Sequence, residues 1–213
     1  MPTPHPVPIF RIIHVDNLEV CLKRGGIYAP LHSPEDGLQY RTIHNNEIQT
    51  IRKTHPIPCG TGGTIHDYVP FYFGPLSPML FQLHTGMVSG YSEGEEPILY
   101  LVTTVESILG AKLQYVFSDG HGIASYTEWF DQVDDLDKVD WEAVYAHYWH
   151  DTLEDNDLQR RKQQAEFLVY QFCPWALIQE IGVLNSKVQN QVSSIIAKYN
   201  VSTKVIVRKQ WYY

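Results

Sequence analysis

Residues 163–172 read QQAEFLVYQF, and this stretch decides the fold class that the sequence predicts. With a period of two, one face of the run holds Glu166, Leu168, Tyr170 and Phe172, and the other face is also mainly apolar. A run that is apolar on both faces predicts a central strand, buried on both sides of a sheet. One carboxylate, that of Glu166, opens this run. Burying a carboxylate without a partner is costly, so Glu166 either meets solvent at the end of the strand or has a function.

Other segments predict further strands and helices. Strands are expected at residues 8–14, 66–73, 97–104, 114–119, 166–172 and 202–213. Helices are expected at residues 18–22, with Asp16 or Asn17 as N-cap, and at 47–54, 77–86, 105–111, 124–136, 140–150, 157–165, 174–181 and 185–200. Strands and helices do not alternate regularly, which indicates an α+β (mixed α/β) class. No repeat or linker interrupts the chain, so residues 1–213 are expected to form a single domain.

The composition bounds the class of protein. The chain has 213 residues, of which 44% are hydrophobic, enough for one substantial core. The sequence contains no run of about 18 apolar residues, which a membrane helix would need. The first residues, MPTPHPVPIF, do not resemble a signal peptide. The three cysteines, Cys21, Cys59 and Cys173, are far apart and form no CxxC motif, which argues against a disulfide framework or a zinc site. A cytoplasmic protein without a metal is expected.

The charge is distributed unevenly along the chain. Its net charge of −8 argues against general nucleic-acid binding. Residues 1–158 hold 8 Lys/Arg and 22 Asp/Glu, a net charge of −14, whereas residues 159–213 hold 8 Lys/Arg and 2 Asp/Glu, a net charge of +6. The basic part is either an ordinary solvated face or a local basic track near Glu166. The residues of such a track would be Arg160, Arg161, Lys162, Lys204, Arg208 and Lys209.

Common catalytic and phosphate-binding motifs are missing from the sequence. There is no GxGxxG after a strand, no GxxxxGK[ST], no GxSxG and no HExxH. The GTGG run at 60–63 follows a loop and indicates a turn. His147 and His150 are three residues apart in HYWH, a spacing that can hold a metal, but no third ligand is identifiable. Aromatic packing or surface exposure explains these two histidines better.

Besides Glu166, four sites are candidates for function, and each also has a purely structural explanation. His14 ends a strand before a helix, where a ligand can meet backbone N–H groups or the histidine can act as a cap. Arg52 lies between two loops and either clamps a phosphate or is a surface arginine. His121 in SDGHG lies in a turn, and YVPFYFGPLSPM at 68–79 is either a site or a hydrophobic strand and turn.

The order of several motifs resembles a known family. The motifs are IIHVDNL, IQTIRK, GGTIHDYVPFYF, SPML, EPILYLV, FSDGHG, QAEFLVY, PWALI and the final RKQWYY. Together they resemble the DarT toxins, bacterial ADP-ribosyltransferases that modify single-stranded DNA. The resemblance covers residues 8–213, and HDYVPFYF with SPML is most similar to the thymidine-modifying branch. It implies an ADP-ribosyltransferase fold with a split, mixed β-sheet core and a cleft for NAD.

The resemblance also implies roles for the candidate catalytic residues. Glu166 matches the family's catalytic glutamate, which binds the nicotinamide ribose and stabilises an oxocarbenium-like sugar as nicotinamide leaves. Arg52 matches an arginine of the NAD-binding element, expected at about 36–54. That arginine contacts NAD and takes part in removing the thymine N3 proton. Because an arginine is normally protonated, stabilisation of charge on the base is the role expected for Arg52. His121 is expected in a substrate loop, about 118–166, where it orients base or phosphate.

The same resemblance implies a set of NAD-binding residues. His14, Val15, Asp16 and Asn17 are expected to hold the nicotinamide side of NAD. Tyr72, Ser77 and Met79 are expected to line the same cleft, with Tyr72 stacking on nicotinamide. Two positions depart from the family's pattern, since Ile51 stands where an arginine is common and Leu76 where a basic residue can precede Ser77.

The implied function is a toxin that transfers ADP-ribose from NAD, a co-substrate, to N3 of thymidine in single-stranded DNA. The resemblance further implies a partner antitoxin whose macrodomain removes the modification, and a monomer is expected. Two alternatives stay open at this point. The acceptor can instead be guanosine in DNA, RNA or a protein side chain, or the chain can be a module that binds NAD or nucleic acid without turnover.

Overall fold

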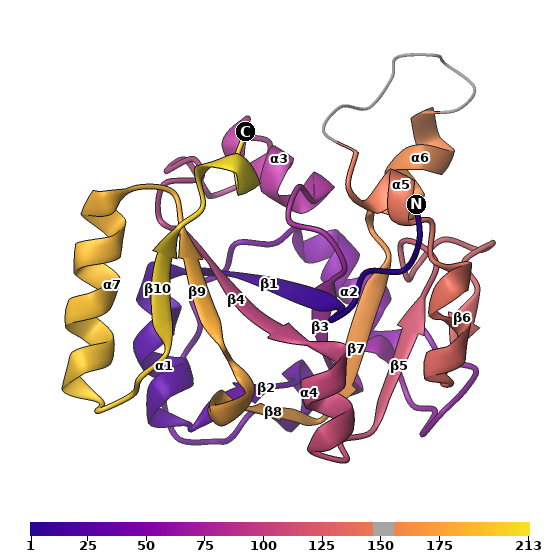
Figure 1. Ribbon diagram of the computed structural model, residues 1–213, viewed down its shortest axis with the longest axis horizontal. Helices are drawn as coiled ribbons and strands as arrows, with labels where there is room; N and C mark the ends of the chain where they lie inside the picture. Colours follow the sequence, from indigo (N-terminus) through magenta and orange to yellow (C-terminus); the bar gives the residue numbers. More distant parts are fainter. Residues whose placement is uncertain (147–155) are drawn as a thin grey trace.

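The computed structural model describes residues 1–146 and 156–213 (Figure 1). Its strands are β1 (Pro8–His14), β2 (Gly26–Tyr28), β3 (Tyr68–Tyr72), β4 (Ile98–Thr104), β5 (Tyr115–Ser118), β6 (Trp129–Phe130), β7 (Glu166–Tyr170), β8 (Phe172–Pro174), β9 (Glu180–Val183) and β10 (Lys204–Val207). Its α-helices are α1 (Leu18–Lys23), α2 (Asn46–Thr54), α3 (Pro78–His84), α4 (Val105–Gly110), α5 (Trp141–Val144), α6 (Asn156–Gln163) and α7 (Ser186–Lys198). Short 3₁₀ helices span Val15–Asn17, Pro30–His32, Ile65–Asp67, Val133–Lys138, Trp175–Leu177 and Lys209–Trp211.

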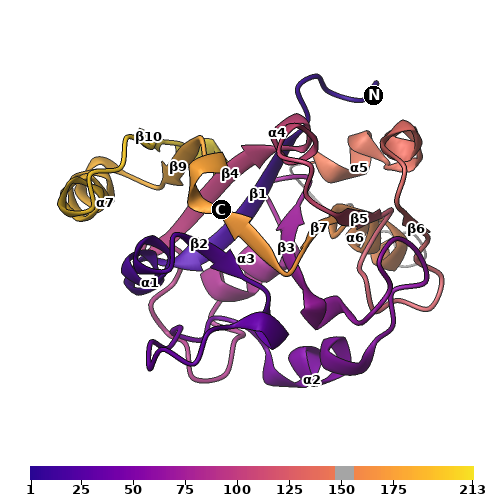
Figure 2. The same cartoon turned by 90° about the horizontal axis from the view of Figure 1, so that it is seen from below.

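A mixed sheet forms the centre of the fold. Its strand order is β10-β9-β4-β1-β3-β7-β5-β6, and β2 pairs with β8 in a separate two-stranded sheet. β9 and β10 run parallel, whereas the other neighbours in the large sheet run antiparallel. Figure 2 shows α7 and β10 at one end of this sheet and β5, β6 and α6 at the other. The predicted mixed α/β class with a mixed sheet is confirmed.

The large sheet divides between β1 and β3. β1 pairs with β4 along its whole length, from Pro8 opposite Thr104 to His14 opposite Ile98. With β3 it shares a single registered pair, Phe10 opposite Tyr72, and beyond that point the two strands diverge. Strands that diverge leave backbone and side chains facing a space that other elements can line. The expected split of the sheet therefore lies between β1 and β3.

Strand β7 is an inner strand, as its two apolar faces predict. It lies between β3 and β5, and its residues 166–169 are all buried. The Phe167 ring stacks on that of Tyr115, with 5.1 Å between centroids. The predicted strand is too long at its end, however, because Gln171 adopts a left-handed backbone, with φ of 58°. Phe172 beyond this kink starts β8 and pairs with β2 instead.

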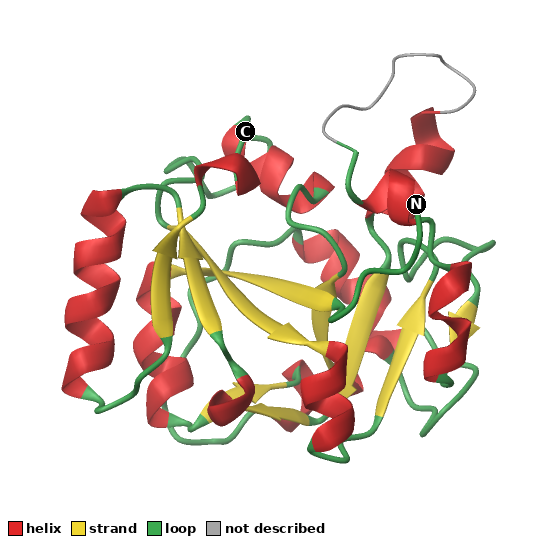
Figure 3. Ribbon diagram, in the orientation of Figure 1, coloured by secondary structure: helices red, strands yellow, loops and turns green. Residues whose placement is uncertain are grey.

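Two predicted helices are wrong because strand pairing overrides local helix preference. Within 124–136, residues Trp129–Phe130 form β6 against β5, where the Phe130 ring stacks on that of Phe117 with 5.2 Å between centroids. Only the 3₁₀ helix from Val133 follows. Within 174–181, a 3₁₀ turn is followed by β9, which is flanked by β4 and β10. Figure 3 shows the strands in the middle of the molecule, with helices around them.

Helix starts follow the capping rules with one exception. Ser77 and Asn185 each accept a hydrogen bond from the backbone N–H three residues on, and so begin α3 and α7 as predicted. Asn17 is the N-cap residue of α1, one of the two predicted, but its side chain makes no capping hydrogen bond. Instead His14 Nδ1 accepts from the backbone N–H of Asp16 at 3.1 Å, which opens a 3₁₀ turn that continues into α1. The helical turn therefore begins at Val15, directly after β1, whereas the sequence predicts a helix from Leu18.

The basic residues of the C-terminal quarter do not form one track. Arg160 and Arg161 lie on α6, whereas Lys204 begins β10 and Arg208 and Lys209 follow its end, on the far side of the sheet (Figures 1 and 2). Of the two alternatives that the sequence left open, a single basic track near Glu166 is therefore wrong.

Within residues 1–146 and 156–213, no helix is long and apolar enough to cross a membrane. In the same ranges no group of three or more His, Cys, Asp or Glu side chains is placed to hold a metal. His147 and His150, and with them residues 147–150 of the helix predicted at 140–150, lie outside the described residues.

Candidate functional site

A cavity of about 620 Å³ opens where β1 and β3 diverge. Arg11 and Ile13 line it from β1, and Pro70 and Tyr72 from β3. Of the residues predicted for the site, those that line it are Asn17, Arg52, Tyr72, Met79, His121 and Glu166. Its volume falls within the range of small-molecule and cofactor sites, roughly 300–1,000 Å³.

An ion pair between Arg52 and Glu166 lies at the centre of the cavity. Arg52, in the last turn of α2, donates from Nη1 to Glu166 Oε1 at 2.7 Å and from Nη2 to Oε2 at 2.9 Å. Arg52 is 6% exposed and Glu166 is 1% exposed. Glu166 therefore has a partner, and it is not a solvent-facing acid at a strand end.

The pair keeps Arg52 charged. Burial lowers the pKa of Arg52, but the charge and the hydrogen bonds of Glu166 outweigh burial, so the net shift is upward. Glu166 itself is the first residue of β7, and its backbone N–H donates to Ser118 Oγ of β5 at 3.3 Å. A two-point contact with Arg52 and a position in the ladder fix this carboxylate in the cavity wall.

Tyr72 presents an aromatic ring beside this pair. It stands directly opposite Glu166 in the β3–β7 register, so both side chains point to the same face of the sheet. Its hydroxyl donates to Met79 Sδ on α3 at 3.8 Å. Burial and the charge of Glu166 raise the pKa of Tyr72, so its hydroxyl is neutral at pH 7. The half-buried ring and Met79 give the cavity an apolar surface next to a carboxylate.

His121 reaches the cavity from the turn after β5. Its backbone N–H donates to the Arg161 carbonyl at 3.0 Å, which ties the turn to α6. A Cβ at Gly120 would overlap the Arg161 guanidinium, which explains the glycine on one side of His121. Burial lowers the pKa of His121, and the charge of Arg52 adds to this, while Glu166 opposes it. The imidazole is therefore neutral at pH 7 and can donate or accept a proton.

Four residues predicted to bind NAD do not line the cavity. His14 is buried and acts as the cap of the turn after β1, and Val15 packs in the core. Ser77 is buried and caps α3 by accepting from the Leu80 backbone N–H at 3.2 Å. Asp16 is exposed and forms an ion pair with Arg41 at 2.8 Å. In this structure they support the residues that line the cavity, and a direct contact with NAD stays a prediction.

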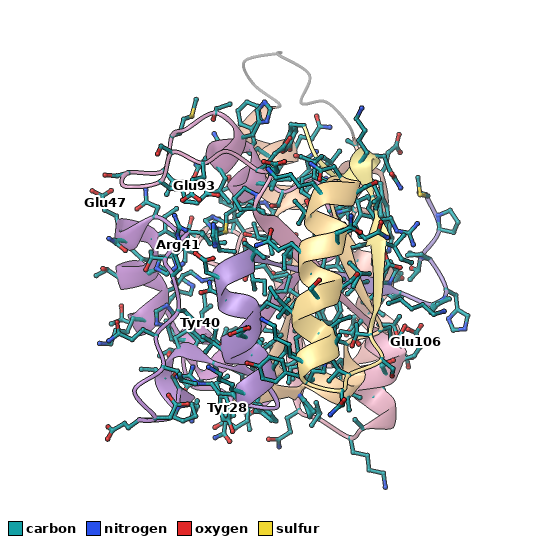
Figure 4. The ribbon with its side chains drawn as sticks, turned by 90° about the vertical axis from the view of Figure 1, so that its left-hand side faces the viewer. Tyr28, Tyr40, Arg41, Glu47, Glu93 and Glu106 are labelled. Carbon is teal, nitrogen blue, oxygen red and sulfur yellow. The ribbon has the colours of Figure 1, made fainter. Side chains whose placement is uncertain are left out.

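One side of the cavity is built by residues 36–54, called the cavity wall below. Arg24 holds its start by donating from Nε and Nη2 to the two carboxylate oxygens of Asp36, at 2.8 and 2.7 Å. Asn17 holds its middle, since Asn17 Oδ1 accepts from the Arg41 backbone N–H at 2.6 Å and Nδ2 donates to the Arg41 carbonyl at 2.9 Å. Figure 4 shows Arg41 between Glu93 and Tyr40 on this side of the molecule, and Arg41 pairs with Glu93.

More arginines than carboxylates line the cavity, although the chain is acidic. Among its described lining residues are five arginines and one carboxylate, that of Glu166. The arginines are Arg11, Arg41, Arg52, Arg160 and Arg161. A low-dielectric site lined by one sign of charge concentrates ligands of the opposite sign. The cavity therefore suits an anionic ligand, whereas most of the surface does not.

Several lining residues were missed by the sequence analysis. Arg11 carries the same kind of signal as Glu166, a charged residue inside the apolar run PIFRIIH, yet it was not noticed. Tyr126 is 58% exposed at the cavity, and the Arg161 guanidinium lies 5.1 Å from its ring centroid. Arg161 also pairs with both carboxylate oxygens of Asp119, at 2.8 and 3.0 Å. No sequence pattern links Tyr126 to Arg161, so only the fold reveals that contact.

Comparison with known proteins gives matches along the whole chain. The family model described as "ssDNA thymidine ADP-ribosyltransferase, DarT" matches residues 10–213. A DNA ADP-ribosyl transferase of Thermus sp. (strain 2.9) is 42% identical over 212 residues, which cover 99% of this chain and 98% of that protein.

Solved structures give the same result. Thermus sp. 2.9 DarT in complex with ADP-ribosylated ssDNA matches with a TM-score of 0.92 and 41% identity, covering 100% of this chain and 99% of that one. Thermus sp. 2.9 DarT in complex with NAD+ matches with a TM-score of 0.86 and 41% identity, covering both chains fully. The resemblance predicted from the motifs is confirmed, and this chain belongs to the DarT family of DNA ADP-ribosyltransferases.

Proposed function

We propose that this chain transfers ADP-ribose from NAD to N3 of thymidine in single-stranded DNA and releases nicotinamide. The observation that carries the proposal is the buried Arg52–Glu166 pair in a basic cavity of about 620 Å³. The Thermus sp. 2.9 relative has been solved with NAD+ and with ADP-ribosylated ssDNA, which supports the same co-substrate and acceptor here.

We assign to Glu166 the stabilisation of the nicotinamide ribose of NAD. As the bond from ribose to nicotinamide breaks, the ribose carbon becomes cationic, and nicotinamide leaves with the bonding electrons. A fixed carboxylate that bonds a ribose hydroxyl stabilises this cation more than the neutral substrate. A strand buried on both sides holds such a carboxylate rigidly, and Arg52 donates a hydrogen bond to each of its two oxygens.

Arg52 and His121 are assigned the base. When N3 attacks the ribose carbon it loses its proton, and negative charge develops on the thymine ring. Arg52 is protonated, so it stabilises that charge and is a poor acceptor for the proton. His121 is neutral, lies in the same cavity and can accept it.

The remaining predicted residues are assigned to NAD. Tyr72 stacks on nicotinamide, with Met79 packed behind its hydroxyl, and Asn17 faces the cofactor from the end of β1. His14, Val15, Asp16 and Ser77 hold these groups in place or contact NAD after it binds. The cavity wall at 36–54 is the NAD-binding element, and 118–166 is the substrate loop, of which 147–155 lie outside the described residues.

The biological role follows from the family. We take residues 1–213 as one domain that acts as a monomeric toxin, with single-stranded DNA as its substrate. Its partner is an antitoxin whose macrodomain removes ADP-ribose from the DNA. Such a toxin needs no general affinity for DNA, which agrees with a net charge of −8 and basic residues gathered at one cavity.

Mass spectrometry of oligonucleotides incubated with NAD tests this function. Single-stranded oligonucleotides with one thymidine are expected to gain one ADP-ribose, and matched oligonucleotides without thymidine are not. Glu166→Ala is expected to abolish the gain. If ADP-ribose is added to guanosine, RNA or protein instead, the acceptor is not thymidine. If the folded wild type neither adds ADP-ribose to any acceptor nor releases nicotinamide, the proposal is refuted.

A further inference from the structure

Arg11 occupies an unusual place on the floor of the cavity. It lies in the middle of β1, opposite Leu101 of β4, in the run PIFRIIH that otherwise builds the core. Its side chain crosses the gap where β1 and β3 part, and Nη1 donates to the Pro70 carbonyl at 2.9 Å. A guanidinium has five N–H donors, so this bond uses only a part of its capacity.

The charge of Arg11 is not balanced by a neighbouring acid. Three other arginines of the cavity have carboxylate partners: Arg41 has Asp16, Arg52 has Glu166, and Arg161 has Asp119. For Arg11 no ion pair is found within residues 1–146 and 156–213, and its buried Nε atom has no hydrogen-bond partner there. A buried polar atom without a partner costs free energy, and a charged group costs more.

The groups around Arg11 are neutral at pH 7. Its ionisable neighbours include Tyr40, Cys21, Cys173 and Tyr72. Burial raises the pKa of Tyr40 to about 12 and that of Cys173 to about 12, and it also raises the pKa values of Cys21 and Tyr72. Hydroxyl and thiol groups therefore surround a cation without neutralising it. A bond that only joins two strands needs no charge, so the charge indicates a ligand.

We propose that Arg11 binds the pyrophosphate of NAD. The planar guanidinium fork matches phosphate oxygens better than any other side chain, and Arg11 lines the same cavity as Glu166 and Tyr72. The pyrophosphate is the anionic part of NAD and adjoins the ribose assigned to Glu166, so a single ligand can reach both residues. This inference rests on the proposed function and adds a residue to it.

A phosphate of the DNA is the other possible anion, and the position of Arg11 argues against it. Arg11 lies at the split of the sheet with a buried Nε, whereas Tyr126 and Arg160 line the cavity with exposed side chains. A polymer backbone reaches exposed groups at an opening more easily than a buried atom on the floor. The smaller ligand therefore fits Arg11 better.

Binding of ADP-ribose and of nicotinamide to the full chain separates these cases. Arg11→Met removes the charge and keeps an unbranched side chain, whereas Arg11→Lys keeps the charge and loses the fork. Lys23→Met, an exposed position on α1, is the control for loss of one positive charge. Calorimetry is expected to give an ADP-ribose affinity about 10–100-fold weaker for Arg11→Met and an intermediate loss for Arg11→Lys. Inhibition by nicotinamide, which has no phosphate, is expected to change less than about twofold.

Each of the following results would contradict the assignment of Arg11 to the pyrophosphate of NAD. Unchanged ADP-ribose affinity in Arg11→Met would show that Arg11 does not contact the pyrophosphate of NAD. Equal losses for ADP-ribose and nicotinamide in both variants, with a lower melting temperature, would make Arg11 a link between strands. A higher KM for the oligonucleotide with unchanged ADP-ribose affinity would assign Arg11 to DNA. Failure of the proposed function is distinct, because the wild type itself would then neither bind ADP-ribose nor release nicotinamide.

Discussion

The floor and the wall of the cavity are built in different ways. The floor consists of Arg11, Tyr72 and Glu166, which project from strands β1, β3 and β7. Arg11 pairs with Leu101 of β4, and Tyr72 pairs both with Phe10 of β1 and with Glu166. The wall, residues 36–54, is irregular as far as α2 and is held by a few polar side chains, among them Arg24 and Asn17. Hydrogen-bonded strands hold their side chains closely in position, whereas a loop that is held by a few polar side chains can open locally.

This difference separates two tasks. Transition-state stabilisation needs atoms held within a fraction of an ångström, which suits the floor. Admission of a cofactor as large as NAD needs a side that can move, which suits the wall. The Arg52–Glu166 pair joins the two, since it ties the last turn of α2 to the first residue of β7. Removal of the Glu166 carboxylate from the floor is therefore expected to affect turnover, and loosening of the wall at its Asp36 clamp is expected to affect binding of NAD.

The largest effect is expected for the floor carboxylate. Glu166→Gln keeps the shape and removes the charge that stabilises the sugar cation, so kcat for nicotinamide release should fall about 10²–10⁴-fold. The KM for NAD should change much less. Glu19→Gln on α1 makes the same chemical change away from the cavity and is expected to retain full activity. A kcat within threefold of the wild type for Glu166→Gln would show that the Glu166 carboxylate takes no part in the reaction.

The link between floor and wall is expected to show in stability. Arg52→Met leaves the Glu166 carboxylate buried without its partner, which should lower the free energy of unfolding by roughly 3–5 kcal/mol. The double variant Arg52→Met/Glu166→Gln should recover part of this loss, because no unpaired charge remains. Urea unfolding of the wild type, both single variants and the double variant measures the coupling. Additive effects would mean that the pair does not join wall and floor energetically.

The same division explains which features could be predicted from the sequence. The inner position of β7 followed from its two apolar faces, and Glu166 stood out as the charge within that run. Arg11 is likewise a charged residue within an apolar run, that of β1, but it belongs to no motif that indicates a function. The partner of Glu166 could not be derived from spacing, since Arg52 is 114 residues away and meets it only after β7 and α2 have packed.

Errors arose where contacts between distant segments decide the local structure. Trp129–Phe130 pairs with β5, and so a predicted helix became a strand. The alternative of one basic track joined residues of the C-terminal quarter that lie at opposite ends of the sheet, because strand order does not follow chain order. The clamps of the wall, such as Asn17 on Arg41, involve loop backbone and carry no periodic signal.

A smaller effect is expected for the clamp at the start of the wall. Asp36→Ala removes both hydrogen bonds to Arg24, which should loosen the wall and raise the KM for NAD about 3–10-fold, with kcat within twofold of the wild type. Glu35→Ala removes the neighbouring exposed acid, for which no ion pair is found in the described part of the chain. Steady-state kinetics of the two variants tests the clamp. Equal KM values in both would show that the wall does not depend on it.

The smallest effect is expected at the junction of wall and floor, where pH changes stability. His66, just before β3, hydrogen-bonds through Nε2 to Gln49 Oε1 of α2 at 3.0 Å. Burial and the charge of Arg52 lower the pKa of His66 to about 4, from an ordinary value of 6.5. The unfolded chain therefore binds a proton at His66 more readily than the folded chain between pH 6.5 and 4, so folding stability falls as the pH falls through this window.

Between pH 7 and pH 6 the part of this loss due to His66 should be below about 1 kcal/mol. His14, His44 and His121 also have pKa values lowered by burial, and they add to the total acid sensitivity of the chain. Comparison of wild type and His66→Gln isolates the one residue, because glutamine can still donate to Gln49 and does not titrate. Urea unfolding at pH 7 and pH 6 should give a smaller pH dependence for His66→Gln. An identical pH dependence would show that His66 is as easily protonated in the folded chain as in the unfolded one, and that the junction between wall and floor is open to water.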